Sequence, residues 1–498
     1  MKQYLLGIDV GTTGTKTLLF SADGALLSHA YKGYPMTCPQ VGYSEQRAED
    51  WWDAIVETVR EACKALPGGA SVAAISLSLQ GGTLVPVDAE GKPLRPAIVW
   101  NDARCQEQHE AFLKEVGPAE LMYELTGWKL GTALLPLEIR WIRDNEPEIF
   151  AKTDKFLSVP DYVSLKMTGE TALDLSDLGI NEMGDVRKAA YDQRLLDFCG
   201  ITEAQLPKIL RSGEVIGHLT EQAAKELGLS TETVLVAGAH DQYAVALGAG
   251  AVHSGDILIG SGTCWVITAI GAEPDFASGL SQSVAAVPGL WGSLWSLSSG
   301  GVCLDWLRKN VALGEGGEPL SYDALNKEVS KRKAAEDGLF FYPFSGTYGE
   351  RKMFKKASFI GMDLSHDRFD MARAVMEGVA FQVVWMMESF KTKPSKDGLK
   401  LAGGASKSPL WCQILADISG LPVRIPEVAD LACVGAAILA GVGCGIYETA
   451  EEGYRRLAVA ERVLQPNPEM VPVYAELFSR YKARAKALGT SGENHSSL

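Results

Sequence analysis

Short apolar runs alternate with stretches of helical periodicity along nearly the whole chain. The apolar runs of strand length lie at residues 72–79, 84–87, 234–238 and 399–402. The stretches with helical spacing or composition lie at residues 48–64, 243–249, 409–419 and 432–442. Strands that alternate with helices predict α/β layers rather than a helix bundle or a β-sandwich.

The first two apolar runs, residues 5–10 and 14–20, flank a turn of Gly and Thr with Asp9 at its mouth. This pattern predicts a tight strand–turn–strand. Glycines let a backbone approach a phosphate closely, and Thr hydroxyls and amides supply donors. Asp9 would repel a phosphate but can hold Mg²⁺ through water. We therefore expect a nucleotide site here that is neither a Walker loop nor a GxGxxG dinucleotide turn.

The strand–turn–strand pattern returns about half a chain later, at residues 256–267. Aligning Gly262-Thr263 with Gly11-Thr12 sets Gly260 against Asp9, so only the first copy keeps the carboxylate. Two phosphate turns with one metal-side Asp indicate a duplicated domain that clamps one nucleotide, as in the actin-like ATPases that it resembles. The junction is expected at residues 248–255.

The bulk properties narrow the class of protein. A chain of 498 residues suits two domains of about 250 residues each. Its net charge of −15 argues against a nucleic acid partner, which would need clustered Lys and Arg. Nine cysteines without metal-ligand spacing indicate reduced thiols in a cytoplasmic protein. We expect no signal peptide, no membrane partner, and a disordered tail over residues 486–498.

The strongest candidate for chemistry follows the strand at residues 234–238, where His240-Asp241-Gln242 opens a helix. Asp at such a junction often only caps the helix, and this alternative stays open. Open α/β sheets, however, place ligands at the carboxyl ends of their strands. A kinase that acts on an alcohol needs a carboxylate to accept the hydroxyl proton. Asp241 is therefore a candidate general base, Gln242 a candidate ligand of neighbouring hydroxyls, and His240 a packing neighbour.

Taken in order, these motifs resemble the FGGY carbohydrate kinases over essentially the whole chain. The matching segments read IDVGTTGTK from residue 8, GAHDQ from 238, GSGT from 260, and LAGGASKSPLWCQILADISGLPV from 401. One departure is Glu138, where the family usually has Lys. Within the family the likeness is greatest to xylulose kinases, through LRPAIVWNDAR at residues 94–104. Those kinases usually place Met-His after Gln80, whereas this chain has Gly81-Gly82, and a pocket without that imidazole discriminates sugars differently.

The resemblance implies two duplicated actin-like, ribonuclease H-like α/β domains around a central cleft. The first, residues 1–248, would bind the sugar and the phosphates and supply the base. The second, residues 249–485, would bind the nucleotide. The resemblance also implies ATP and Mg²⁺ as cofactors, a small-molecule sugar as substrate, and a homodimer as the assembly.

Carried over position by position, the resemblance assigns a role to each site residue. Residues expected at the β- and γ-phosphates are Thr12, Thr13 and Lys16, with Asp9 near Mg²⁺. Residues expected at the nucleotide from the second domain are Gly262, Thr263, Gly301, Gly404 and Ser408. Residues expected at the sugar are Gln80, Gly81, Trp100, Asp102, Asp241 and Gln242. For Trp100, simple core packing is an equal alternative.

The expected reaction is ATP-dependent phosphorylation of a sugar's primary hydroxyl, D-xylulose to D-xylulose 5-phosphate, with Asp241 as general base. One alternative keeps the chemistry and changes the acceptor to another ketose or a polyol. An alternative of another class is a nucleotide-gated actin-like binding protein without sugar kinase activity. Such a protein would not need Asp241 beside Gln242, nor the loop at Gln80.

Overall fold

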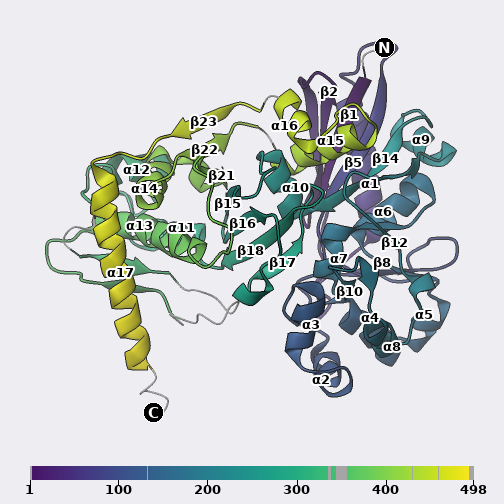
Figure 1. The fold of residues 1–498 in the computed structure, drawn as a ribbon, viewed down its shortest axis with the longest axis horizontal. Helices are drawn as coiled ribbons and strands as arrows, with labels where there is room; N and C mark the ends of the chain where they lie inside the picture. Colours follow the sequence, from purple (N-terminus) through teal and green to yellow (C-terminus); the bar gives the residue numbers. More distant parts are fainter. Residues whose placement is uncertain are drawn as a thin grey trace.

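The computed structural model describes residues 3–131, 133–334, 338–343, 356–428, 430–457 and 459–492. Its two large mixed sheets lie side by side, one in each half of the molecule (Figure 1). Helices cover the sheets, as the alternation of apolar runs and helical periodicity predicts.

The first sheet has the strand order β13-β14-β5-β1-β2-β3. Its strands are β1 Gln3–Val10, β2 Gly14–Ser21, β3 Leu26–Gly33, β5 Ser71–Leu79, β13 Val215–His218 and β14 Val234–His240. Strand β1 is antiparallel to β2 and parallel to β5, and its register sets Asp9 opposite Lys16. Helix α1, Ala48–Cys63, buries Trp51, Ile55 and Val59 in the core of this half.

The second sheet has the strand order β17-β18-β16-β15-β21-β22-β23. Its strands are β15 Ile257–Ser261, β16 Trp265–Gly271, β17 Ser281–Val284, β18 Trp291–Leu297, β21 Leu399–Gly403, β22 Val423–Pro426 and β23 Glu461–Leu464. Strand β15 is antiparallel to β16 and parallel to β21, just as β1 is to β2 and β5. The shared pattern confirms the duplication. Helices α13, Arg368–Met387, and α14, Pro409–Ser419, bury their apolar side chains in the core of this half.

Two helices connect the halves by crossing from one to the other. Helix α10, Asp241–Gly248, continues from β14 of the first sheet, yet its Tyr243 hydroxyl donates to the Gly292 carbonyl of β18, 3.2 Å away. Helix α15, Leu431–Gly443, follows β22 of the second sheet and packs on β1, β5 and β14 of the first. Each half therefore contributes a helix that packs against the other half's sheet.

The crossing of α10 and α15 leaves no room for side chains at two glycines. A Cβ atom on Gly435 would lie 2.0 Å from the Ala244 carbonyl oxygen. A Cβ atom on Gly248 would lie 1.9 Å from the carbonyl oxygen of Leu431. The two helix backbones are thus in direct contact, and the crossing depends on glycine at both positions.

The predicted division at residue 248 follows the sheets, but one later segment crosses it. Residues 431–457, which include α15 and helix α16, Ala450–Leu457, lie beside β1 and β2 (Figure 1). The tail also differs from the expectation of disorder from residue 486. Helix α17, Met470–Gly492, stays helical to Gly492 because Tyr474, Leu477, Tyr481 and Ala485 anchor it on the core. Residues 493–498 lie outside the described residues.

The other elements complete the two halves. The helices are α2 Gln106–Glu115, α3 Ala119–Thr126, α4 Leu135–Asn145, α5 Pro147–Lys152, α6 Val159–Thr168, α7 Leu175–Asn181, α8 Gln193–Cys199, α9 Glu221–Leu227, α11 Gly301–Asn310 and α12 Tyr322–Val329. The 3₁₀ turns are η1 Glu203–Gln205, η2 Phe276–Ser278 and η3 Ala405–Lys407. The short strands are β4 Glu45–Gln46, β6 Val85–Val87, β7 Ala97–Ile98, β8 Lys155–Leu157, β9 Ala172–Asp174, β10 Gly184–Asp185, β11 Ala190–Tyr191, β12 Lys208–Leu210, β19 Phe340–Tyr342 and β20 Ser358–Ile360.

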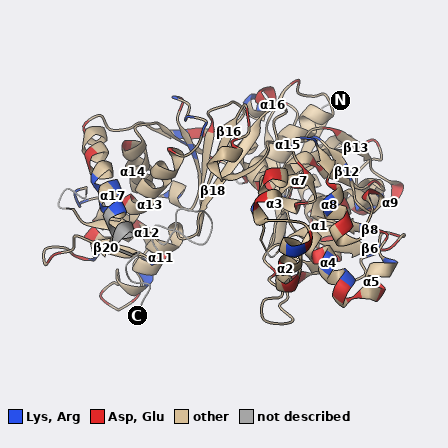
Figure 2. Ribbon diagram, turned by 60° about the horizontal axis from the view of Figure 1, so that its bottom comes forward, with Lys and Arg blue, Asp and Glu red and all other residues tan. Residues whose placement is uncertain are grey.

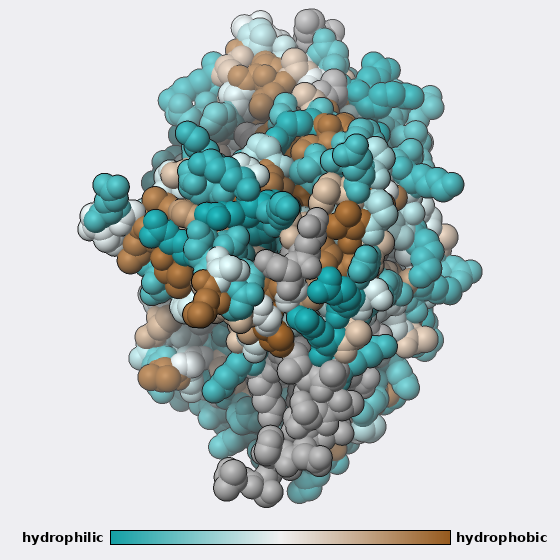
Figure 3. All heavy atoms as spheres, turned by 90° about the vertical axis from the view of Figure 1, so that its left-hand side faces the viewer, coloured by the Kyte–Doolittle hydropathy of each residue, from teal (hydrophilic) through white to brown (hydrophobic). Residues whose placement is uncertain are grey.

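The surface is mixed in character. Acidic and basic residues are interspersed over the outer helices of both halves (Figure 2). At the end of the molecule formed by the second half, hydrophobic residues are scattered among hydrophilic ones (Figure 3). Among the described residues, no helix combines the length and apolarity needed to cross a membrane. All nine cysteines lie in the described part of the chain, and each is a free thiol.

Substituting Gly435→Ala tests the helix crossing. Ala normally stabilises a helix interior by about 1 kcal/mol relative to Gly, so a simple propensity effect would raise the melting temperature. We expect a loss of about 2 kcal/mol or more instead, because the new methyl group overlaps the Ala244 carbonyl. Calorimetry measures the change in Tm. The control is Gly68→Ala, where a Cβ atom meets nothing within 4 Å, and an equal Tm in both variants would contradict the crossing.

Candidate active site

The first phosphate turn is joined to the predicted sugar loop through one hydroxyl. A hydrogen bond of 3.1 Å from the Gly11 amide to the Gly14 carbonyl closes the turn. The Thr12 hydroxyl donates to Gln80 Oε1 at 2.9 Å and accepts from Trp100 Nε1 at 3.0 Å. The side chain of Thr13 points outward and is exposed. The structure therefore brings Thr12, Gln80 and Trp100 together, and Trp100, 49% exposed, is not a core residue.

Asp9 and Lys16 meet a carboxylate that the sequence did not reveal. Ser78 Oγ donates to Asp9 Oδ1 at 2.9 Å. Lys16 Nζ lies 2.6 Å from Asp430 Oδ2 and 3.6 Å from Asp9 Oδ2. Asp430 caps α15, where its Oδ1 accepts from the Cys433 amide at 3.1 Å. Asp430 can be recognised from the sequence as the capping residue of the helix that follows it. Its contact with Lys16, 414 residues earlier, cannot.

The surroundings of Asp9 suit a divalent cation. Burial, together with the charge of Asp430, raises the pKa of Asp9 to about 7. A nearby cation would offset both effects, because it stabilises the ionised carboxylate. Among the described residues, no three His, Cys, Asp or Glu side chains form a metal cluster. The neighbouring carboxylates of Asp9 and Asp430 fit Mg²⁺, which commonly takes one or two carboxylates together with water and phosphate oxygens.

Asp241 is the first residue of α10 and stands at the carboxyl end of β14. Its side chain is 37% exposed, and its Oδ1 lies 3.3 Å from His240 Nε2. The charge of Asp241 also contributes to the raised pKa of Asp9, so the two carboxylates are near enough to interact electrostatically. Gln242, the next residue, is half-buried. A partly exposed carboxylate in this position can accept a proton from a bound alcohol.

The predicted sugar loop continues from Gln80 through Gly81 and Gly82, and a hydrogen bond to Asn181 fixes its backbone. The Gly82 amide donates to Asn181 Oδ1 at 2.9 Å, and Gly82 has a φ of +68°. Asn181 Nδ2 in turn donates to Ser158 Oγ at 3.3 Å. Several acids of the first half are fully buried, and burial raises the pKa of each of them: Glu138, Asp161, Asp174, Asp177 and Glu182.

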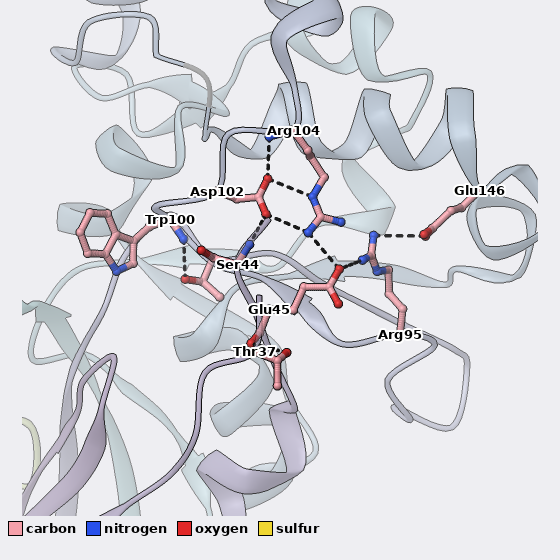
Figure 4. A network of polar contacts seen from close by, with 9 residues as sticks. Thr37, Ser44, Glu45, Arg95, Trp100, Asp102, Arg104 and Glu146 are labelled. Atoms are coloured by element: carbon pink, nitrogen blue, oxygen red, sulfur yellow. Dashed lines mark hydrogen bonds and ion pairs between the residues drawn. The ribbon is translucent and has the colours of Figure 1, made fainter. Parts of the chain in front are cut away.

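Asp102, predicted to contact the sugar, lies in a buried network of polar contacts. Its carboxylate accepts from the Ser44 amide at 2.6 Å and from Arg104 Nε and Nη2 at 2.9 and 2.8 Å (Figure 4). Arg104 continues to Glu45 at 2.9 Å. With only 3% of Asp102 exposed, its oxygens are committed to this network. The residue braces the loop that carries Trp100, whose ring points away from the network (Figure 4).

The second group of predicted residues gathers around β15 and β21. Gly262 and Thr263 are exposed, and their carbonyls accept from the Gly301 and Val302 amides, both at 3.2 Å. The Gly404 amide donates to the Ser261 carbonyl at 2.7 Å. These contacts join the second turn to the start of α11 and to the end of β21.

Ser408, the last residue of the second group, has an occupied hydroxyl. It caps α14 by accepting from the Trp411 amide at 3.2 Å. It also donates to Asn326 Oδ1 at 3.0 Å. The hydroxyl thus caps α14 and joins it to α12.

Comparison with known proteins identifies the family. The N-terminal domain of the FGGY family of carbohydrate kinases matches residues 4–248, and the C-terminal domain of that family matches residues 256–444. The chain belongs to the FGGY family of carbohydrate kinases. It is an ATP-dependent sugar kinase with the actin-like two-domain fold that the sequence predicts. Membership favours this activity over an actin-like binding protein.

Relatives of this FGGY kinase act on different sugars. It is 30% identical to a xylulose kinase of Lactococcus lactis, over 96% of each chain. It is 29% identical to a gluconokinase of Bacillus subtilis, over 91% of this chain and 88% of that one. The crystal structure of xylulose kinase from Rhodospirillum rubrum superposes with a TM-score of 0.87 at 25% identity, covering 97% and 99% of the two chains. The comparisons therefore establish the family and the kinase reaction, while the acceptor differs between the relatives.

Asp161, one of the buried acids, predicts a pH dependence of stability. Burial raises its pKa from 3.8 to about 7, so between pH 4 and 7 the folded kinase keeps a proton that the unfolded chain releases. The free energy of unfolding should fall as pH rises across this window, by up to roughly 4 kcal/mol for this group.

The variant Asp161→Asn keeps an acceptor for Ser158 but cannot titrate. We expect its Tm, relative to the unsubstituted kinase, to increase steadily from pH 5 to pH 7. The control is Asp53→Asn on the exposed side of α1, which should show no such trend. A constant Tm difference between the Asp161 variant and the parent would contradict the prediction.

Proposed function

We propose that this kinase transfers the γ-phosphoryl group of ATP to a primary hydroxyl of a ketopentose. D-Xylulose, which would give D-xylulose 5-phosphate, is the first candidate. The observation that carries the proposal is the place of Asp241, which presents a partly exposed carboxylate at the carboxyl end of β14. The same region holds Asp9 and, through Thr12, the sugar loop.

In the proposed step, Asp241 accepts the proton of the attacking hydroxyl. The hydroxyl oxygen forms a bond to the γ-phosphorus, and the bond between that phosphorus and the β–γ bridging oxygen breaks, with ADP as the leaving group. Thr12, Thr13 and Lys16 would hold the phosphates. Asp9 would hold Mg²⁺, which supplies neutralisation of phosphate charge when bound. Lys16 would exchange part of its contact with Asp430 for a phosphate oxygen.

The two halves would divide the substrates between them. Residues 1–248 would bind the sugar and the phosphates, with Gln80, Gly81, Trp100 and Gln242 toward the sugar. Residues 249–485 would bind the nucleotide, through Gly262, Thr263, Gly301, Gly404 and Ser408. Closure of the halves around the α10–α15 crossing would exclude water, which otherwise competes as an acceptor. The homodimer implied by the family resemblance and the cytoplasmic setting expected from the cysteines stay predictions.

A second candidate acceptor is gluconate, because a gluconokinase is as similar to this chain as a xylulose kinase is. The loop supports keeping this candidate, since Gly81 and Gly82 offer no imidazole to a ketose. Another ketose or a polyol is a further alternative of the same chemistry.

The base assignment is tested by Asp241→Asn. An amide cannot accept the proton, so kcat should fall by about 10³-fold or more, whereas ATP affinity should change less than about twofold. Steady-state kinetics and ATP titration measure the two quantities. Asp53→Asn serves as a control for loss of one exposed carboxylate. Substantial residual turnover in the Asp241 variant would rule out its role as base.

A coupled ADP-release assay over pentuloses, hexuloses, aldonates and polyols identifies the acceptor. We expect the largest kcat/KM with D-xylulose. A larger value with gluconate or a polyol would reassign the substrate and leave the kinase reaction intact. If no acceptor raises ADP release above background, the proposed step itself fails.

A further inference from the structure

His240 is a buried side chain that contacts the proposed base. Only 4% of the residue is exposed, and its Nε2 lies 3.3 Å from Asp241 Oδ1. The Asp241 side chain, by contrast, is 37% exposed. The imidazole thus supports the carboxylate from the protein side, and burial keeps it from reaching an acceptor hydroxyl itself.

The His240 ring is held by its backbone and by aromatic packing. Its amide donates to Ser176 Oγ at 2.9 Å, and Ser176 Oγ itself donates to Asp174. The ring packs edge-on to Trp128, with centroids 6.1 Å apart and an interplanar angle of 81°. Its Nδ1 is buried and has no hydrogen-bond partner among the described residues. The ring also packs against Tyr243, with centroids 5.7 Å apart, and interacts electrostatically with Asp174, while its Nε2 makes the contact with the proposed base.

The sugar loop sets the space available to this ring. A Cβ atom on Gly81 would lie 3.1 Å from His240 Cδ2, 3.0 Å from Asp177 Oδ1 and 2.5 Å from Ile180 Cγ2. Gly81 does not have a positive φ, so its backbone conformation does not itself require glycine. Space for the neighbouring side chains does require it, and the histidine ring is one of those neighbours.

We propose that His240 is a positioning residue that orients the Asp241 carboxylate, and that Gly81 provides the space that the ring needs. The inference rests on the proposed function, in which Asp241 is the base. A proton on Nε2, which lies 3.3 Å from Oδ1, would hold that oxygen and leave Oδ2 to accept the hydroxyl proton. The Gly81-Gly82 loop, which has no histidine, is thereby coupled to His240 beside the base.

The first test compares two replacements of His240 with the acceptor that the ADP-release screen selects. His240→Leu removes the donor, and we expect kcat to fall by about 10- to 100-fold with the KM for ATP changed less than twofold. His240→Gln places an amide N–H at similar reach and should recover most of the lost kcat. A purely structural role, filling the space beside the Trp128 and Tyr243 rings, gives no reason for Gln to recover kcat better than Leu. A Leu variant as active as the Gln variant would therefore overturn the proposal.

The second test is a double-mutant cycle between the loop and the ring. Gly81→Ala should lower kcat, whereas Gly68→Ala, which adds the same methyl group in open space, should not. In a His240→Ala background the contact with the ring is gone and only those with Ile180 and Asp177 remain, so Gly81→Ala should lower kcat by a smaller factor there than in the parent. Melting temperatures confirm that each variant is folded, and the double variant keeps the test valid if Gly81→Ala alone folds poorly. Additive losses would overturn the coupling.

The outcomes separate this inference from the function on which it rests. If Asp241→Asn stays active, the base assignment and the inference both fail. If Asp241→Asn is inactive while His240→Leu and Gly81→Ala keep the parental kcat, only the positioning role fails.

Discussion

The fold depends on the direct backbone contact between α10 and α15. Each helix begins at the end of one sheet and packs on the other, so neither half is complete without a segment from its counterpart. The contact leaves no space for a Cβ atom at Gly248 or Gly435. The same two helices begin with Asp241 and Leu431, the latter directly after the capping residue Asp430. The crossing that holds the halves together thus also fixes the carboxylates near Asp9.

Much of the architecture was accessible from the sequence because it is encoded locally. The Gly-Thr turns, the apolar runs around them and the helix at residues 48–64 all have short-range signatures, and their repetition predicted the duplication. The return of residues 431–457 to the first sheet has no such signature, because it depends on tertiary packing between glycines far apart in the sequence. The helix beyond residue 486 was missed for a related reason, since its start is anchored by packing that local composition does not report.

The candidate site shows the same division between local and tertiary information. Asp9, Thr12 and Asp241 were accessible because each stands beside a turn or a strand end. Asp430 was not, although it modifies the environment of Asp9 and Lys16 more than any residue near them in sequence. For Asp102 the sequence indicated a sugar contact, and that role stays a prediction. The sequence did not indicate its buried contacts with Ser44 and Arg104, which depend on tertiary packing.

The packing of α15 on the first sheet has a consequence for how the chain is made. Leu5, Ala74 and Val236, from three strands of that sheet, pack against Ala440 and Tyr447. During synthesis all three strands emerge at least about two hundred residues before Ala440, so this apolar face of the sheet is uncovered while the second half is translated. The first half is therefore synthesised first, but its core is complete only after residues 431–457 have been made. A fragment that ended at residue 248 would keep that face exposed.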